Sequence, residues 1–166
     1  MLELVIKDLM KFEGLVLKAY KCPGGKTSIG YGRNLEDNGI SKKEAEIMIY
    51  NDIAYLINEL DRKVNFWKGE QVNVRILLLQ MAYQLGVHGL LKFKNFLEAL
   101  KQKDYENAKL EILNSRWATQ TPKRVAELTK YLDLITGEKE LKQWKKDIIV
   151  IREFTNAIQN MSLVEA

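Results

Sequence analysis

The hydrophobic pattern begins with a helix that stops at a conspicuous carboxylate. Residues 2–12 place Val5, Leu9 and Phe12 on one helical face. Glu13-Gly14 follows, and glycine is the usual residue just beyond a helix end. The first element is therefore predicted to be a helix that ends beside an acidic side chain. A solvated last-turn residue is the simpler interpretation of that glutamate when it is considered alone.

Downstream of residue 39 the chain indicates one helix after another. Residues 41–62 carry a long apolar stripe, and Ser41 with Glu44 three positions later has the spacing of a capping box. Residues 70–86 are apolar nearly all round, which is typical of the central helix of a lobe. The periodicity predicts further helices over residues 90–100, 104–113, 122–136 and 138–160.

The stretch from residue 13 to residue 35 interrupts this helical pattern. Six of the ten glycines fall within the first 39 residues. Cys22-Pro23-Gly24-Gly25 has the residues of a tight turn, and Thr27–Gly32 alternates as a strand does. Gly30 and Gly32 share one face of that strand. They indicate either close approach of a ligand or a twisted hairpin that needs slim residues.

Composition and charge narrow the class of protein. The net charge is +4, and residues 92–146 hold 13 Lys and Arg against 8 Asp and Glu, an excess of 5. Such a surface attracts polyanions, although a solvated basic face is the commoner explanation. One His and one Cys exclude an internal disulfide and argue against a structural zinc site. A nucleic-acid binder that uses Lys123, Arg124 and Lys130 is an alternative, but it leaves the glycine-rich stretch without a purpose.

Localisation is a separate expectation. No run of about 18 apolar residues exists, so we expect no transmembrane segment. Glu3 and Asp8 interrupt the first apolar residues, and the start of the chain does not have the pattern of a signal peptide. We therefore expect synthesis in the cytoplasm and action elsewhere only after release.

Three ordered motifs resemble those of one family. They are Glu13-Gly14 followed by Cys22 and Ser28-Ile29-Gly30-Tyr31-Gly32, then residues 80–86 with Phe93 beyond, then residues 115–124. Together they resemble the phage-type lysozymes of glycoside hydrolase family 24, the small muramidase endolysins of tailed phages. The resemblance covers most of residues 1–137 and does not extend to residues 138–160.

The resemblance implies a fold and its division. We expect an α+β, mainly helical, lysozyme-like fold with a small N-terminal β lobe joined by a long helix to a helical C-terminal lobe. The boundaries follow the sequence pattern: a β lobe over about 14–40, a connecting helix over about 41–62, a helical lobe over about 66–137 together with residues 1–12, and an extra helix over about 138–160.

The resemblance also implies catalytic roles. Glu13 would be the general acid, and Arg124 matches the arginine that pairs with it, so a Glu13–Arg124 contact is predicted. Cys22 stands where the family usually has Asp, and Ser28 where it has Thr. The Ser28 hydroxyl can still position a water. The Cys22 thiolate can stabilise a developing cation, act as a base toward water or attack as a nucleophile, and these alternatives stay open.

Further positions correspond to the family's saccharide cleft. Substrate-binding residues are expected to be Gly30, Arg33, Leu35, Tyr83, Gln84 and Trp117. Arg33 can alternatively contact Glu36 and Asp37, and core packing is an equal alternative for Trp117. Phe96 and Glu111 occupy sugar-contacting places without keeping the family's residue types.

The resulting functional expectation is a monomeric endolysin that needs no metal or cofactor. It would hydrolyse the β-1,4 bond between N-acetylmuramic acid and N-acetylglucosamine in peptidoglycan and so cause bacterial lysis. The stereochemical outcome is left open. The alternative is a non-catalytic peptidoglycan-binding protein of the same fold, in which Cys22 remains a neutral thiol.

Overall fold

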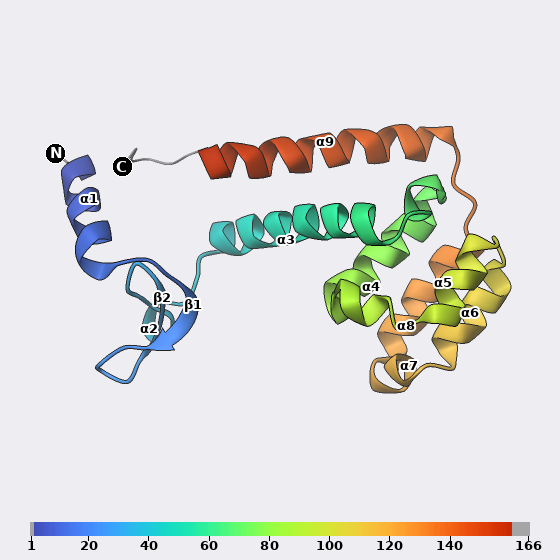
Figure 1. Cartoon of the computed structure of the whole chain (residues 1–166), viewed down its shortest axis with the longest axis horizontal. Helices are drawn as coiled ribbons and strands as arrows, with labels where there is room; N and C mark the ends of the chain where they lie inside the picture. Colours follow the sequence, from blue (N-terminus) through green and yellow to red (C-terminus); the bar gives the residue numbers. More distant parts are fainter. Residues whose placement is uncertain (1, 161–166) are drawn as a thin grey trace. The chain divides into compact units, whose positions relative to one another are not determined.

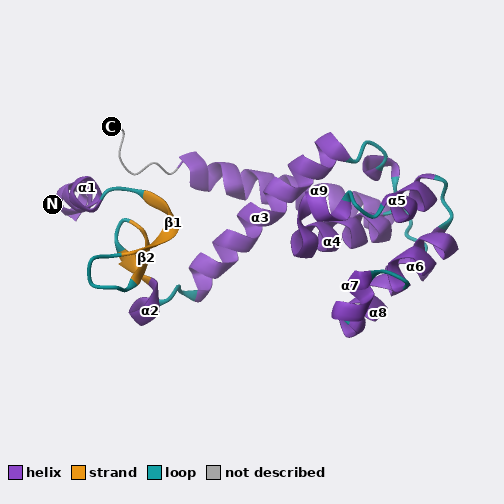
Figure 2. Ribbon diagram, turned by 60° about the horizontal axis from the view of Figure 1, so that its bottom comes forward, coloured by secondary structure: helices purple, strands orange, loops and turns teal. Residues whose placement is uncertain are grey.

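The computed structural model describes residues 2–160, which form a mainly helical chain with one small sheet (Figures 1 and 2). The fold class expected from the sequence is confirmed, since 74% of the chain is helical and the strands lie near the N-terminus. The elements are α1 Leu2–Glu13, β1 Val16–Lys21, β2 Thr27–Gly30, β3 Arg33–Asn34, α2 Leu35–Asn38, α3 Lys42–Lys63, α4 Val72–Leu90, α5 Lys94–Lys101, α6 Tyr105–Leu113, α7 Arg116–Gln120, α8 Pro122–Thr129 and α9 Glu138–Asn160, with short 3₁₀-helices at Trp67–Gly69 and Lys130–Asp133.

The chain divides into two compact units, and the boundary falls within α3. Residues 2–48 form the first unit, called here the sheet unit, and residues 49–159 form the second, called here the helical unit. None of the residues of α1 is buried within the sheet unit. The predicted packing of residues 1–12 with the helical lobe stays a prediction.

The sheet unit is built on an antiparallel sheet with the strand order β1-β2-β3. Tyr20 pairs with Ser28 and Lys21 with Thr27, so the Cys22–Lys26 turn closes a hairpin as predicted. Gly30 and Gly32 both have positive φ, 66° and 74°, a region that side chains with a β-carbon rarely adopt. Backbone conformation is therefore one reason for these two glycines.

The helical unit is organised around α4, whose buried residues form the centre of the hydrophobic core. Leu77, Leu78 and Met81 are fully buried there. The helix is longer than the predicted 70–86, because it continues to Leu90 through a non-helical Gly86 with φ 70° and ψ 157°. A kink at glycine thus replaces the predicted helix end, while the apolar centre is confirmed.

Other boundaries differ from the predictions where short helices end. The helix predicted over 122–136 stops at Thr129 and continues as a 3₁₀ turn to Asp133. The capping box is confirmed, since the Ser41 N–H donates to Glu44 at 2.7 Å and the Glu44 N–H donates to the Ser41 hydroxyl. Local chemistry therefore determined helix starts more exactly than helix ends.

The last helix, α9, packs against the part of α3 that belongs to the helical unit (Figure 1). The rings of Tyr50 and Phe154 lie 4.9 Å apart between centroids, and Arg152 donates to Asp61 at 3.2 Å. Trp144 meets the buried Trp67 edge to face. The element that the sequence resemblance left unmatched is thus an integral layer of this unit.

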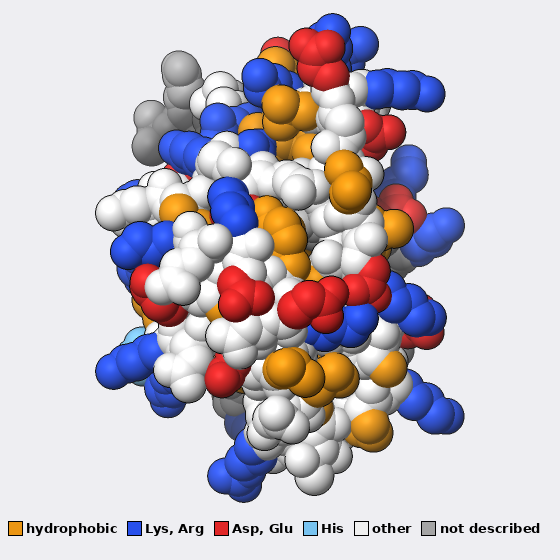
Figure 3. Space-filling view, turned by 90° about the vertical axis from the view of Figure 1, so that its right-hand side faces the viewer, with side chains coloured by type: hydrophobic (Ala, Val, Ile, Leu, Met, Phe, Trp, Pro, Cys, Tyr) orange, Lys and Arg blue, Asp and Glu red, His pale blue; other side chains and the backbone are white. Residues whose placement is uncertain are grey.

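On one face of the molecule, charge is mixed rather than gathered into one patch (Figure 3). On the face shown in Figure 3, Lys and Arg side chains lie around the edge, and Asp and Glu lie among them. In the basic half, Lys109 pairs with Asp133 and Lys130 with Glu127, both at 2.7 Å. The pairing of Lys130 removes one cation from the nucleic-acid alternative.

Among residues 2–160 no single helix is long and apolar enough to cross a bilayer, and α4 with α5 reaches that length only as a pair bent by 114°.

Candidate active site

Glu13 is the last residue of α1, and its carboxyl group lies directly over Gly32. Gly14 ends the helix with φ 69°, and its N–H donates to the Met10 carbonyl. A β-carbon at position 32 would lie 2.6 Å from Oε2 of Glu13, which is closer than real contacts allow. The positive φ favours glycine at position 32, and the missing side chain leaves room for the flexible Glu13 carboxyl group over the strand. The acidic residue that the sequence singled out is placed against the glycine-rich strand.

Cys22 opens the turn between β1 and β2, and hydrogen-bond donors converge on its sulfur. The backbone N–H of Lys26 is the largest influence that lowers the pKa of the Cys22 thiol. The Gly24 N–H and the Ser28 hydroxyl also donate toward Sγ and lower it, while partial burial acts in the opposite direction. Donors of this kind stabilise negative charge, so the site favours the thiolate.

Ser28 is held where its hydroxyl can reach that sulfur. It is 2% exposed and lies on β2, opposite Tyr20 of β1 and Asn34 of β3. Both neighbouring strands fix its backbone, and its side chain is almost fully buried. The structure therefore brings Cys22 and Ser28 together, as the spacing of the first motif implied.

A surface network fastens the turn that carries Cys22. The Glu36 carboxylate accepts from Lys21 at 2.8 Å and from the Thr27 hydroxyl and N–H at 2.7 and 2.9 Å. These contacts lower the pKa of Glu36 from 4.5 to about 2, with the Lys21 hydrogen bond as the largest cause. Lys26 pairs with Asp37 at 3.0 Å. Both ends of the turn are thus tied to the start of α2.

Arg33 is used differently from the sequence expectation. Its Nε donates to the Gly39 carbonyl at 2.8 Å and its guanidinium pairs with Glu44 at 2.6 Å. The alternative contact with Glu36 and Asp37 is wrong, because Glu44 at the start of α3 reaches Arg33 and the two acids are occupied by lysines. Arg33 ties the strand to α3, and a sugar contact for it stays a prediction.

In the helical unit, Trp117 belongs to the core. It is 4% exposed and packs edge to face on Phe93, with 6.2 Å between ring centroids. Among the described residues, its Nε1 and the Oε1 of Gln84 are buried without a hydrogen-bond partner. Buried polar atoms without partners cost stability, so each calls for an explanation. The packing alternative for Trp117 is confirmed, and Gln84 is the stronger functional candidate.

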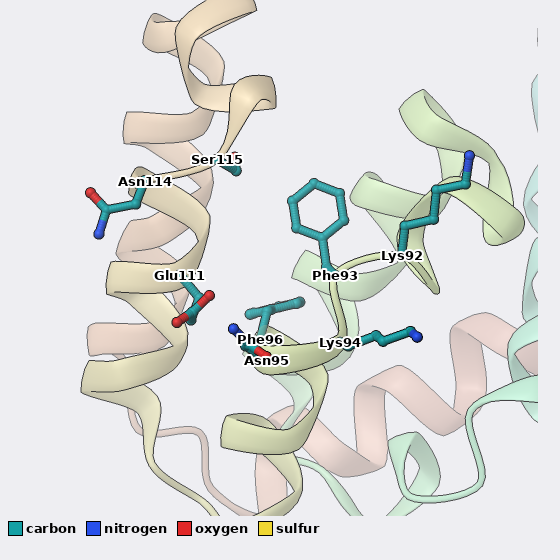
Figure 4. A pocket seen from close by; sticks show the side chains of 8 residues that line it. All are labelled: Lys92, Phe93, Lys94, Asn95, Phe96, Glu111, Asn114 and Ser115. Carbon is teal, nitrogen blue, oxygen red and sulfur yellow. The ribbon is translucent and has the colours of Figure 1, made fainter.

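A pocket of about 470 Å³ opens between α6 and the start of α5 (Figure 4). Phe96 and Glu111, the two weakly matched positions, both line it. Phe93 and Ser115, which belong to the second and third motifs, also line it. Sequence reasoning missed the other four lining residues, because they become neighbours only when α5 packs on α6: Lys92, Lys94, Asn95 and Asn114. Aromatic carbon beside amides, a hydroxyl and a carboxylate suits a hydroxylated ligand.

The remaining predicted residues lie in both units. Leu35 is half-buried at the start of α2, and Tyr83 is 44% exposed on α4. Arg124 is exposed on α8, and His88 is exposed near the end of α4. Glu13 and Arg124 belong to different units, and their contact stays a prediction. Within residues 2–160, no group of three or more His, Cys, Asp and Glu side chains is arranged to hold a metal ion.

Comparison with known proteins adds an independent finding. A family described as "Phage lysozyme" matches residues 10–131. "Probable T4-type lysozyme 2" of Dictyostelium discoideum is 28% identical, covering 72% of this chain and 88% of that protein. "Peptidoglycan hydrolase gp36" of Pseudomonas phage phiKMV is 29% identical over 75% of this chain and 14% of its own length. "Pre-baseplate central spike protein Gp5" of Enterobacteria phage T4 is 30% identical over 66% and 20% respectively.

Proposed function

Since this chain belongs to the phage lysozyme family and is a peptidoglycan-hydrolysing lysozyme, we propose that it cleaves the β-1,4 bond between N-acetylmuramic acid and N-acetylglucosamine. One observation carries the proposal. Glu13 presents a carboxyl group over Gly32, and the same small unit holds a sulfur that three hydrogen-bond donors stabilise as an anion. A proton donor and an anionic group are the two parts that glycoside hydrolysis needs.

Glu13 acts as the general acid in this proposal. Its protonated carboxyl group gives a proton to the glycosidic oxygen while the bond to the anomeric carbon breaks, and positive charge develops on the sugar ring. Gly32 leaves the carboxyl group uncovered by any side chain at that position. Loss of this proton donor should therefore remove turnover without affecting the packing of either unit.

Cys22 supplies the negatively charged group that the reaction needs beside the positively charged sugar ring. With Ser28 positioning a water, the thiolate can accept the proton of that water as it attacks, which inverts the anomeric configuration. If the sulfur instead bonds the anomeric carbon, a water must later displace it and the configuration is retained. Both routes use the thiolate, which the Lys26 and Gly24 N–H groups stabilise.

The helical unit supports saccharide binding in the same proposal. Phe93 offers an apolar ring surface at the pocket, and Ser115, Asn95 and Glu111 offer polar groups around it. Gln84 keeps a buried oxygen that no described residue uses. A core that retains an unpaired polar atom at a cost in stability is consistent with a binding role.

The decisive experiment is digestion of purified peptidoglycan followed by mass spectrometry of the released ends. A muramidase adds one water per cut and leaves reducing N-acetylmuramic acid, whereas a lytic transglycosylase adds none and an amidase releases stem peptides. Reducing N-acetylmuramic ends that are absent with Glu13→Gln support the proposal. Reducing N-acetylglucosamine or anhydro ends would reject it. NMR of the first anomer formed separates inversion from retention.

The lytic role is a further part of the proposal. We expect a monomer made in the host cytoplasm that reaches the wall only after release. Expressing cells should stay turbid until chloroform permeabilises the inner membrane, and then clear within minutes. Cells that express Glu13→Gln should stay turbid after the same treatment, and clearing in that control would contradict the role.

A further inference from the structure

A second groove lies along the seam between α3 and α9, with a volume of about 500 Å³. From α3 it is lined by Asn51, Ala54, Tyr55 and Asn58, and from α9 by Arg152, Thr155, Asn156 and Gln159. Both sets have the spacing i, i+3, i+4, i+7, which places each on one face of its helix. The groove shares no lining residue with the pocket at Phe93.

Small side chains form the buried part of the groove. Ala54 is 7% and Thr155 6% exposed. The Thr155 hydroxyl donates to backbone carbonyls of its own helix, those of Ile151 and Arg152. Because the Thr155 hydroxyl faces its own helix backbone, the Thr155 methyl group is the part of the side chain that faces the groove. Ala54 and the Thr155 methyl group therefore give the groove a largely apolar floor.

The walls carry amides where helix packing would normally place apolar side chains. Asn51, Asn58, Asn156 and Gln159 are exposed, and none of these side chains makes a hydrogen bond within the described part of the chain. Contacts on either side of the groove already hold the helix pair, namely Tyr50 with Phe154 and Asp61 with Arg152. The amides are not needed for packing and are available to a ligand.

The lining chemistry selects one class of ligand. Each amide both donates and accepts, which matches hydroxyl and N-acetyl groups. The Tyr55 side chain is 62% exposed and offers a ring face on which a sugar can lie. Among the described residues that line the groove, Arg152 alone is charged, and Asp61 already pairs with it, so a polyanion finds little attraction. Four amides also disfavour a purely apolar ligand.

We propose that this groove is a second saccharide-binding site, which holds an N-acetylated glycan strand of peptidoglycan. The inference rests on the proposed function for its choice of polymer. The residues of α9 lie beyond the 10–131 that match the family, so this chain builds half of the site from its own last helix. Holding the same polymer at a second site raises its effective concentration at the first.

Binding is tested in the full-length Glu13→Gln protein, so that turnover does not enter. The test variant adds Asn51→Ala, Asn58→Ala and Asn156→Ala. The control adds Asn65→Ala and Asn107→Ala, two exposed amides elsewhere in the helical unit that also lack side-chain hydrogen bonds among the described residues. Co-sedimentation with purified sacculi should weaken about tenfold for the test variant, as expected for the loss of several neutral hydrogen bonds, and stay unchanged for the control.

A soluble probe identifies the ligand class. Titration with the tetramer of N-acetylglucosamine should shift the NMR side-chain amide signals of Gln159 and the amides around it, and the test variant should lose those shifts. Signals that move only around Phe93, or sacculus binding equal to the control, would overturn the proposal. Shifts produced by free stem peptide and not by the tetramer would also overturn the glycan assignment. Melting temperatures of all variants exclude unfolding as the cause.

These readouts are independent of the cleaved bond. With Glu13 restored, the triple variant should cut short soluble glycan fragments at the parental rate and cut sacculi more slowly. If the released ends are not those of a muramidase, the proposed function fails while groove binding is still measured. If the ends are correct and the triple variant processes sacculi at the parental rate, the groove proposal fails alone.

Discussion

The two units of this lysozyme divide stability and chemistry unequally. Among residues 2–48 only Ser28 is buried, and hydrogen bonds and ion pairs at the surface hold the sheet unit. The helical unit is built on a continuous apolar core from α3 to α8, with Trp144 and Ile148 of α9 packed against it. The proposed acid and thiolate both lie in the unit that has almost no core.

This difference indicates how the site can be changed. Burial of apolar side chains supplies most of the favourable free energy of folding, so most of the stability comes from the helical unit. Exposed ion pairs contribute little stability, but they fix direction and register. In the sheet unit they fasten the turn that carries Cys22. Substitutions there should change activity more than stability, and substitutions in the core should do the reverse.

The largest expected effect is that of Glu13→Gln. Removing a general acid should lower kcat for sacculi by about 10²–10⁴, while the melting temperature stays unchanged because the side chain is exposed. Glu3→Gln on the same helix is the matched control, and its rate should equal that of the parent. A Glu13→Gln rate within twofold of the parent would remove the acid from this account.

The next effect is that of the Cys22 thiolate. Cys22→Ser should be nearly inactive, with a loss of about 100-fold, because a hydroxyl stays neutral. Cys22→Asp should be active and resist alkylation, which abolishes parental activity. Since the lowered pKa keeps the thiolate at lower pH, parental activity should fall only as the pH drops through that value.

The same Cys22 variants can also contradict the proposed role of the sulfur. In Cys22→Asp the acid limb of the pH profile should move lower, because carboxyl groups titrate near 4. A full-rate Cys22→Ala variant, or identical acid limbs for thiol and carboxyl, would end the role of the sulfur.

A matched pair of leucines tests where stability lies. Leu78→Ala in the core of α4 should lower the free energy of unfolding by about 2–5 kcal/mol, because it leaves a cavity. Leu17→Ala on β1, where the side chain is 78% exposed, should cost less than about 0.5 kcal/mol. Denaturant titration measures both. Equal losses would contradict the division between the units.

Gln84→Met tests chemistry within the stable unit. The variant removes a buried oxygen that lacks a partner in the described structure, so stability should stay level or rise by up to about 1 kcal/mol. Activity on sacculi should nevertheless fall about tenfold if the amide contacts substrate. Loss of stability together with full activity would make Gln84 a structural residue instead.

The smallest effect concerns Glu36. Its pKa is about 2 in the folded protein and near 4.5 otherwise, so the unfolded chain binds more protons between these values. The stabilisation it provides is therefore complete above pH 4.5 and is lost as the pH falls toward 2. Hydrogen exchange at the Thr27 amide should accelerate over that range, and Glu36→Gln should show fast exchange already at neutral pH.

Several features of this chain follow from nearest neighbours, and the sequence predicted them well. The capping box at Ser41 and Glu44, the stop at Gly14 and the turn after Cys22 depend on residues within four positions of one another. The candidate chemistry at Glu13, Cys22 and Ser28 came instead from the resemblance of three ordered motifs to a known family. Helix ends were less exact, because Gly86 was able to kink a helix without ending it.

Contacts between residues that are distant in the sequence were known only from the tertiary structure. No sequence pattern showed that N–H groups would converge on the Cys22 sulfur, that Glu44 would pair with Arg33, or which of the two interpretations of Trp117 was correct. Nor did periodicity show that amides of α3 and α9 would face one groove.

Sequence by itself determined the kind of each element and the residues available for chemistry, because backbone propensity and side-chain spacing act locally. Tertiary structure decided which of those residues meet, which are charged and which are covered. Those properties depend on how elements pack across the whole unit, where a single contact joins positions about 90 residues apart, as Asp61 and Arg152 show.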